Sequence, residues 1–272
     1  RLAAEAGANM ADAVAGLITD LTRRAANATT APLVRGLDAS AVRRNVLKRP
    51  VEQALRNGYL VGQRQAAREV QQLPRGQVTF SEQAETTLMA MQQRGGLVGA
   101  RAQSFFTNKA FWITGNLVDD VLKRAQVVLF NALKQDKTPG QVGYELDQAL
   151  AEYLPERDAI GRVVNVPARL ETIARTNIAE AVNEGRWATF TDPDLEGFVT
   201  FLRYSAVLDS RTRETHRAWD GVTLPPNHPA WFGPPDERPP NGFGCRCVLI
   251  PISAADAEAQ EILLCIQTQT TI

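Results

Sequence analysis

Histidine and cysteine are scarce in this chain of 272 residues, which holds two histidines and three cysteines. So few cysteines exclude a small secreted fold stapled by disulfides, and they fit a reducing compartment. Thirty basic residues balance thirty acidic ones, which argues against a protein that coats nucleic acid by bulk charge. The GxGxxG, P-loop, HExxH and GxSxG patterns of common cofactor and hydrolase sites are also absent.

Long apolar runs are missing as well. The best candidate, residues 111–130, contains Asp119, Asp120, Lys123 and Arg124. A helix that crosses a bilayer needs about 20 predominantly apolar residues. The sequence therefore predicts no transmembrane span and no membrane partner.

The first 190 residues have a helical composition, because Ala, Leu, Gln, Glu and Arg dominate them. The longest helical pattern covers residues 101–134, and we expect the pair Gly115-Asn116 to divide it. Further helices are predicted to begin near Ser81 and at Thr138, where a side-chain oxygen can accept the free N–H groups of a first turn.

Two prolines mark further helix boundaries in this region. Pro50 is expected to begin a new helix or to kink the one before it, because its ring removes a backbone donor. Another helix is expected to open near Pro167 and to run to about residue 190. The segment 1–191 is therefore predicted to be a helical domain.

The composition changes after residue 191. Three short stretches have strand character, at residues 197–204, 222–224 and 245–252. Between them, residues 225–240 hold seven of the fifteen prolines, so this loop cannot be a helix or a central strand. We predict a mainly α protein in which long helices precede a short antiparallel sheet and a proline-rich loop. The small C-terminal α+β domain would span 192–253, with a tail over 254–272.

The zero net charge conceals a basic N-terminal part. Residues 1–75 carry twelve Lys and Arg but six Asp and Glu. Such an end suggests docking onto an anionic surface, either duplex DNA or an acidic protein, and the alternative is a set of solvated helix faces. The candidate nucleic-acid contacts are Arg43, Arg44, Lys48 and Arg49.

Both histidines and two of the cysteines fall within one 32-residue window. His216, His228, Cys245 and Cys247 together make a full tetrahedral set for a structural zinc, which would also hold the proline-rich loop in shape. The Cys-x-Cys spacing is tighter than the usual two-residue gap. The alternative is a hydrogen-bonded histidine with two core cysteines.

A second group of polar residues precedes this window. Asp209, Arg211 and His216 lie within eight residues and could form an acid–base set. The structural alternative is that Asp209 accepts hydrogen bonds from Arg211 or from backbone N–H groups in a turn. Asp220-Gly221 is a turn signal before a strand. Nothing nearby supplies a nucleophile, so the structural role is favoured and the protein is expected not to be an enzyme.

The run LRYSAVLDSRTRETHRAWDGVTLPPNHPAWFGPPDERPPNGFGCRCVLIPI, residues 202–252, resembles the signature of the phage Mu F-like minor head proteins, the phage head morphogenesis family. The helix IARTNIAEAVNEGR, residues 173–186, resembles the family's Ala-Arg-Thr-Glu helix. It places Arg175 among the motif residues and Asn177 where the family usually has Glu. The resemblance covers roughly residues 140–252.

This resemblance implies a virion component present in few copies at the portal vertex, made in the host cytoplasm during assembly. Such a protein would act in head assembly and in handling packaged DNA, with the portal protein and other head or neck proteins as partners. Many relatives carry Cys-x-x-Cys where this chain has Arg213-x-x-His216, so zinc would be lost or completed by His228. The rival functions are a hydrolase or nuclease using Asp209, Arg211 and His216, and a DNA-binding module using the basic helices.

Overall fold

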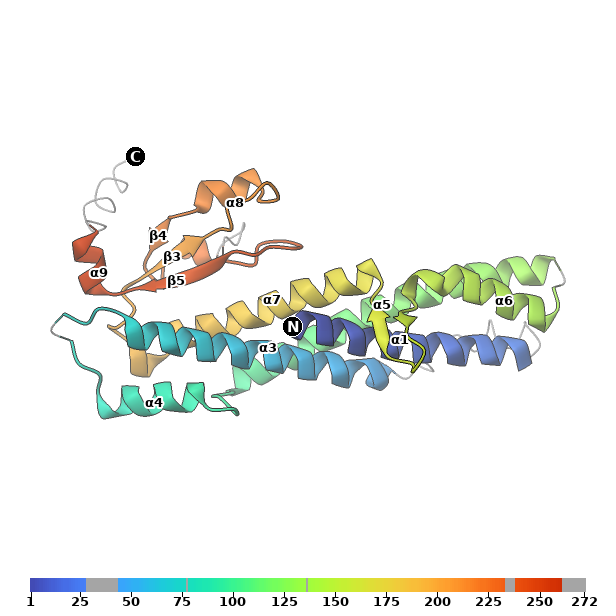
Figure 1. Ribbon diagram of the computed structural model, residues 1–272, viewed down its shortest axis with the longest axis horizontal. Helices are drawn as coiled ribbons and strands as arrows, with labels where there is room; N and C mark the ends of the chain where they lie inside the picture. Colours follow the sequence, from blue (N-terminus) through green and yellow to red (C-terminus); the bar gives the residue numbers. More distant parts are fainter. Residues whose placement is uncertain (28–43, 77, 136, 233–237, 261–272) are drawn as a thin grey trace. The chain divides into compact units, whose positions relative to one another are not determined.

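The computed structural model describes residues 1–27, 44–76, 78–135, 137–232 and 238–260 (Figure 1). Long helices come first and a small antiparallel sheet lies near the C-terminus, which confirms the predicted fold class. None of the described helices is both long and apolar enough to cross a membrane.

Contacts divide the chain into two compact units, and each unit is built from two separate segments. Unit 1 combines Arg1–Leu55 with Ala100–Arg175, and unit 2 combines Arg56–Gly99 with Thr176–Ile272. The segment 192–253 therefore packs with earlier parts of the chain in unit 2. That it forms a folding domain by itself stays a prediction.

Unit 1 is helical apart from one small hairpin. Its elements are α1 (Leu2–Asn27), the start of α3 (Arg44–Gln72), α5 (Ala100–Lys134), α6 (Pro139–Leu150), the short 3-10 helix η1 (Ala151–Tyr153), strands β1 (Glu156–Arg157) and β2 (Val163–Asn165), and the start of α7 (Ala168–Phe190). Helix α6 packs against both α1 and α5. The buried side of α1 recurs every three or four residues, as an amphipathic helix requires, and consists of Ala6, Met10, Ala11, Val14, Ile18 and Leu21.

Local signals set two helix starts where the sequence predicted them. Thr138 caps α6 in a capping box with Gln141, and Pro139 takes the first helical position. Ser81 caps α4 (Glu82–Gln92) by accepting the Ala84 N–H at 3.0 Å. Both caps satisfy amide groups that have no partner inside the helix, so they act without tertiary contacts.

The helix start predicted at Pro50 and the break predicted at Gly115-Asn116 are wrong, whereas a kink at Pro50 stays a prediction. Pro50 lies inside α3, and α5 runs through Gly115-Asn116 without interruption. Their neighbours explain both results, because burial of apolar side chains beside each break outweighs a local cost of about 1 kcal/mol for glycine and about 3 for proline. These buried neighbours are Leu47, Val51 and Leu55 around the proline and Ile113, Leu117 and Val118 around the glycine.

Unit 2 places a three-stranded sheet against helices. Its remaining elements are the 3-10 helix η2 (Pro193–Leu195), β3 (Phe201–Ser205), α8 (Glu214–Trp219), β4 (Thr223–Leu224), the 3-10 helix η3 (Pro229–Trp231), β5 (Val248–Ile252) and α9 (Ala254–Ala259). The strand order is β4-β3-β5 and both pairings are antiparallel, with Tyr204 opposite Leu249. One apolar core joins the sheet to α3, α4 and α7, and it includes Val70, Leu88, Trp187 and Trp231.

Helices α3 and α7 approach each other closely within unit 2, and glycine makes this possible. A Cβ added at Gly62 would lie 1.9 Å from the Val182 carbonyl oxygen, and one at Gly185 would lie 2.0 Å from the Tyr59 carbonyl oxygen. Gly58 also faces Ala181 across the same contact. Only small residues let two helix backbones come this near, so the pair Gly62 and Gly185 fixes the crossing.

A buried ion pair lies along the same helix pair. The guanidinium of Arg186 donates two hydrogen bonds of 2.7 Å to the Glu69 carboxylate and a third of 2.7 Å to the Leu249 carbonyl oxygen. The Arg186 side chain is 6% exposed, whereas that of Glu69 is 38% exposed. Arg186 therefore ties α7 to α3 and to strand β5 at one point.

Candidate metal centre

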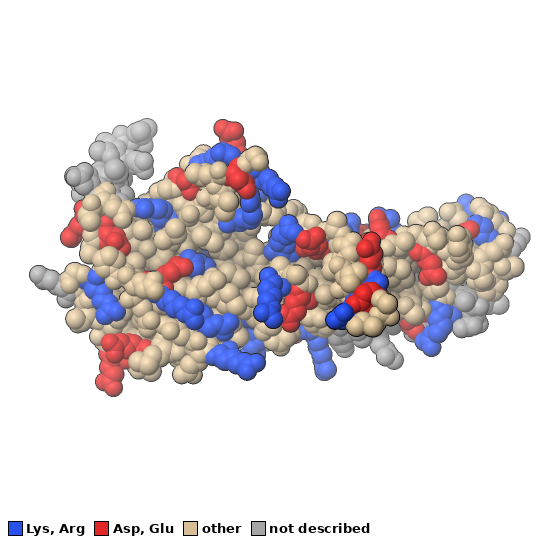
Figure 2. Space-filling model, in the orientation of Figure 1, with Lys and Arg blue, Asp and Glu red and all other residues tan. Residues whose placement is uncertain are grey.

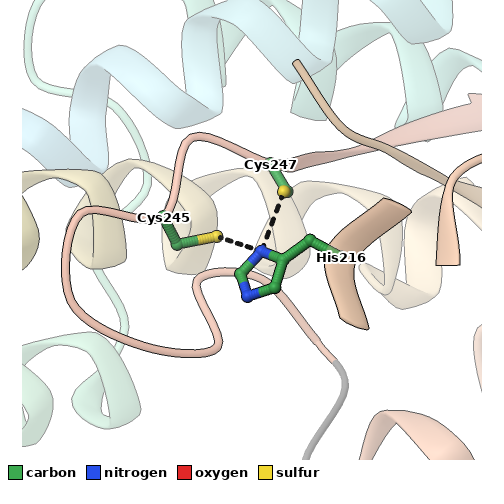
Figure 3. A group of neighbouring side chains, drawn as sticks. All are labelled: His216, Cys245 and Cys247. Carbon is green, nitrogen blue, oxygen red and sulfur yellow. Dashed lines mark hydrogen bonds between the residues drawn. The ribbon is translucent and has the colours of Figure 1, made fainter. Parts of the chain in front are cut away.

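Three of the four predicted zinc ligands meet in one buried group. His216 comes from α8, whereas Cys245 and Cys247 lie just before β5. Figure 3 shows both sulfurs directed toward the same ring nitrogen. The distances from Nδ1 of His216 are 3.3 Å to the Cys247 Sγ and 3.6 Å to the Cys245 Sγ, and all three ligand atoms lie within 4.8 Å of one another.

The Cys-Arg-Cys spacing suits this arrangement. In extended backbone, residues two apart face the same side and the residue between them faces the other. Accordingly Cys245 and Cys247 are buried while Arg246 is exposed. Glycines at positions 242 and 244 have positive φ, so the chain can turn sharply there, and the Cys245 N–H closes the turn on the Gly242 carbonyl oxygen.

Two polar side chains border the group on its inner side. The Tyr204 hydroxyl donates to the Asn241 side-chain oxygen at 3.1 Å and lies 3.5 Å from Nδ1 of His216. That Asn241 oxygen also accepts from the Cys245 thiol at 3.5 Å. Burial raises the pKa of Tyr204, so its hydroxyl stays protonated. Neither residue was singled out from the sequence, because nothing local marks them.

The proton on the His216 ring is placed by its neighbour Arg213. The Arg213 guanidinium lies 3.3 Å from Nε2 and can only donate, so Nε2 accepts and the ring proton sits on Nδ1, facing the sulfurs. A metal bound at Nδ1 would take the place of this proton. The proton would then move to Nε2, and the hydrogen bond from Arg213 would end.

The thiols of Cys245 and Cys247 differ in acidity. The hydrogen bond between them lowers the pKa of the Cys245 thiol and raises that of the Cys247 thiol. Metal binding requires thiolates. One of the two sulfurs is thus disposed toward coordination in the folded chain.

The donor set fits zinc. With Zn–S near 2.3 Å and Zn–N near 2.05 Å in a tetrahedron, a sulfur and a nitrogen ligand stand about 3.6 Å apart. The two nitrogen–sulfur distances of 3.3 and 3.6 Å agree with that spacing. Three protein ligands leave one zinc position to a water or to a neighbouring oxygen.

His228, the fourth predicted ligand, is not part of this group. Its Nδ1 accepts the Ala230 N–H at 3.2 Å, which begins the 3-10 helix η3. The imidazole therefore caps a turn in the proline-rich loop.

Asp209 organises the loop between β3 and α8. Its carboxylate accepts two hydrogen bonds of 2.6 Å from the Arg246 guanidinium, one of 3.0 Å from the Arg211 N–H and one of 3.1 Å from the Thr212 hydroxyl. None of these four hydrogen bonds, all of them between described residues, involves His216. The arrangement agrees with the structural interpretation, in which Asp209 holds a turn, and the pairing with Arg246 was not foreseen.

Asp220 and Gly221 form the predicted turn before β4. The Asp220 carboxylate accepts the Ala206 N–H at 2.8 Å, and Gly221 has a φ of +83°, which favours glycine. The turn holds the start of the loop that leads to α8.

Comparison with known proteins matches this part of the chain. Residues 130–250 fit the family model described as Phage Mu protein F like protein. The matched segment contains Asp209, His216, Cys245 and Cys247. Over residues 130–250 the chain is similar to this family, and these residues are called the Mu F-like region below. No solved structure gave a significant match.

Two curated relatives agree with the Mu F-like assignment. The chain is 41% identical over 81 residues to the Mu-like prophage FluMu F protein of Haemophilus influenzae, covering 30% of this chain and 18% of that protein. It is 33% identical over 89 residues to protein F of Escherichia phage Mu, whose name assigns it to capsid assembly, covering 33% of this chain and 19% of that protein. The matches thus span less than a fifth of either relative.

The other predicted residues lie away from the metal centre. Arg175, within the Mu F-like region, is exposed and pairs with Glu171 one helical turn away. Of the candidate nucleic-acid contacts, Lys48 is half-buried and Arg49 is exposed on α3. Arg43 and the side chain of Arg44 lie outside the described residues.

The acid stability of the Mu F-like region should depend on Asp209. The Arg246 guanidinium holds the pKa of this carboxyl well below its usual value of 3.8. A depressed pKa in the folded state contributes stability that is present above pH 4 and is lost as pH falls through the folded value. Asp209→Asn removes this contribution. Melting temperatures of the two proteins should therefore converge as the pH is lowered from 7 to below about 3. A constant difference across that range would contradict this role.

Proposed function

We propose that this protein is a minor head protein of a tailed phage or prophage that acts in capsid assembly. The observation that carries the proposal is the Mu F-like match over residues 130–250, together with the relative from Escherichia phage Mu that is named for capsid assembly. We place the protein at the portal vertex of the virion and, before that, in the host cytoplasm during assembly. Its partners would be the portal protein, other head or neck proteins and packaged duplex DNA.

Exposed apolar side chains on α5 support a partner for unit 1. Phe111, Trp112, Val127 and Phe130 are each 56–62% exposed. Large apolar side chains gathered on one exposed helix commonly mark a protein–protein interface. We propose that these exposed side chains of α5 contact the portal or a neighbouring copy, while the exposed Arg49 and half-buried Lys48 of α3 are available to DNA.

A non-enzymatic role agrees with the polar groups of unit 2. The Asp209 carboxylate is occupied by Arg246 and by loop groups, so it is not positioned to act as a base beside His216. We propose that these residues stabilise an interaction module.

Deletion in the parent phage tests the proposed function. Induced cultures lacking the gene should yield few DNA-filled heads, and a plasmid copy should restore them. In purified heads, gold-labelled antibody against the protein should mark a single vertex. Normal heads without the protein would overturn the head-assembly role, and label spread over the whole shell would overturn the vertex position.

We propose further that His216, Cys245 and Cys247 bind a structural zinc ion. The nitrogen–sulfur spacing agrees with the tetrahedral value, and all three residues are buried. The ion would join α8 to the start of β5 across a loop that has little apolar core of its own.

Elemental analysis of the full chain, purified without chelator, should find one zinc per chain. His216→Ala and Cys247→Ser should remove it, since each deletes one of three protein ligands. His228→Ala is the matched control and should retain the zinc. Folded protein without zinc would overturn the site, and loss of zinc in His228→Ala would overturn the three-residue ligand set.

A further inference from the structure

A pocket of about 150 Å³ opens beside the metal centre, within unit 2. Its lining includes Arg211, Arg213 and Arg246 together with His216, Cys245 and Cys247. One water needs only ~10–15 Å³ of such space. The pocket can therefore hold a small polyatomic ligand directly over the metal ligands.

The three arginines retain donors for such a ligand. Arg246 uses two N–H groups on Asp209, and Arg213 donates to His216 and to the Phe243 carbonyl oxygen. Arg211 is exposed, and its guanidinium makes no hydrogen bond or ion pair with any described residue. Each guanidinium carries five N–H groups. Most of the donors that line the pocket are thus unused.

The charge of the pocket favours an anion, and a bound metal would increase this preference. Zinc with two thiolates carries no net charge, so three arginines against one aspartate leave the surroundings with two positive charges. The same metal would also end the hydrogen bond from Arg213 to Nε2, which returns that donor to the pocket. On the face shown in Figure 2, Lys and Arg side chains lie beside α8 together with Asp and Glu side chains.

We propose that this pocket binds a phosphate group, supplied by free inorganic phosphate or by a phosphodiester of nucleic acid. Arginine forks match the oxygens of a phosphate two at a time, and several forks around one cavity suit a tetrahedral oxyanion. None of the residues that line the pocket is acidic, and the Asp209 carboxylate is already paired with Arg246. The inference goes beyond head assembly. It depends on the proposed metal centre only for part of the positive charge around the pocket, because the three arginines supply the rest.

Calorimetric titration of the full chain with inorganic phosphate tests the pocket at low ionic strength. Arg211→Gln should bind phosphate about tenfold more weakly, because it removes one charged hydrogen-bond donor group. Arg94→Gln is the matched control, since Arg94 is exposed in the same unit and does not line the pocket. No binding by the unaltered protein, or equal affinities of the two variants, would overturn the proposal.

A second titration separates the two sources of phosphate. If nucleic acid supplies it, a labelled oligonucleotide should bind, Arg211→Gln should weaken it about tenfold, and inorganic phosphate should compete. If free phosphate is the ligand, oligonucleotide binding should be the same in Arg211→Gln and Arg94→Gln. Zinc content measured on the same samples reports on the metal centre separately, so its failure is distinguishable from failure of the pocket.

Discussion

Gly62→Ala should destabilise unit 2 by about 3 kcal/mol, the upper end of the usual cost of overpacking. The new Cβ would lie 1.9 Å from the Val182 carbonyl oxygen, which is a backbone atom and cannot rotate away. Helices α3 and α7 must therefore separate, which loosens the packing around them. Gly185→Ala meets the Tyr59 carbonyl oxygen at 2.0 Å and should have a similar effect.

Urea unfolding followed by circular dichroism measures this cost. Gly115→Ala is the matched control: it lies in the interior of α5, and nothing lies within 4 Å of its added Cβ. Alanine there should stabilise by about 0.5–1 kcal/mol, because it restricts the unfolded chain. If the unfolding free energy of Gly62→Ala lies within about 0.5 kcal/mol of that of the unaltered protein, glycine does not fix the crossing of α3 and α7.

Glu69→Gln should cost about 2 kcal/mol, because it leaves the buried Arg186 charge without its carboxylate. The cost stays below the 3–5 kcal/mol of a fully buried pair, since Glu69 is 38% exposed and water can replace part of the interaction. The Leu249 carbonyl oxygen still accepts from Arg186 in the variant.

A surface pair supplies the comparison for this second effect. Glu171→Gln breaks the exposed contact with Arg175 and should change stability by less than about 0.5 kcal/mol. The double variant Glu69→Leu with Arg186→Met should lose less unfolding free energy than the two single variants lose in total, because no charge is left buried. Equal effects of Glu69→Gln and Glu171→Gln in chemical unfolding would contradict the buried role.

Local chemistry explains which parts of the fold could be predicted. Ser81 and Thr138 fix helix starts through bonds three residues away, so short sequence windows contain the whole signal. Pro50 and Gly115 misled the prediction because the packing that overrides them comes from distant segments. The crossing at Gly62 and Gly185 had a signal in the spacing of small residues, Gly58 to Gly62 and Ala181 to Gly185, which was not used.

The sequence predicted the residue types of the metal centre, but it did not predict which of the histidines and cysteines belong to it. His216, Cys245 and Cys247 stand out because histidine and cysteine are rare in this chain. His228 has the same chemistry, and only the path of the proline-rich loop decides that it caps η3. Asn241 and Arg246 were missed for the same reason, since their roles depend on where the chain returns beside α8.

The shared core of unit 2 has a consequence for the order in which the nascent chain can fold. Val70 and Leu88 are synthesised well before Leu249, yet all three belong to one core. Synthesis proceeds at about 5–20 residues per second. The apolar sides of α3 and α4 therefore stay without their β5 partner for roughly 10–30 s during synthesis. A fragment limited to residues 130–250 would never receive them, so the segment that carries the family resemblance is shorter than the unit that must fold around it.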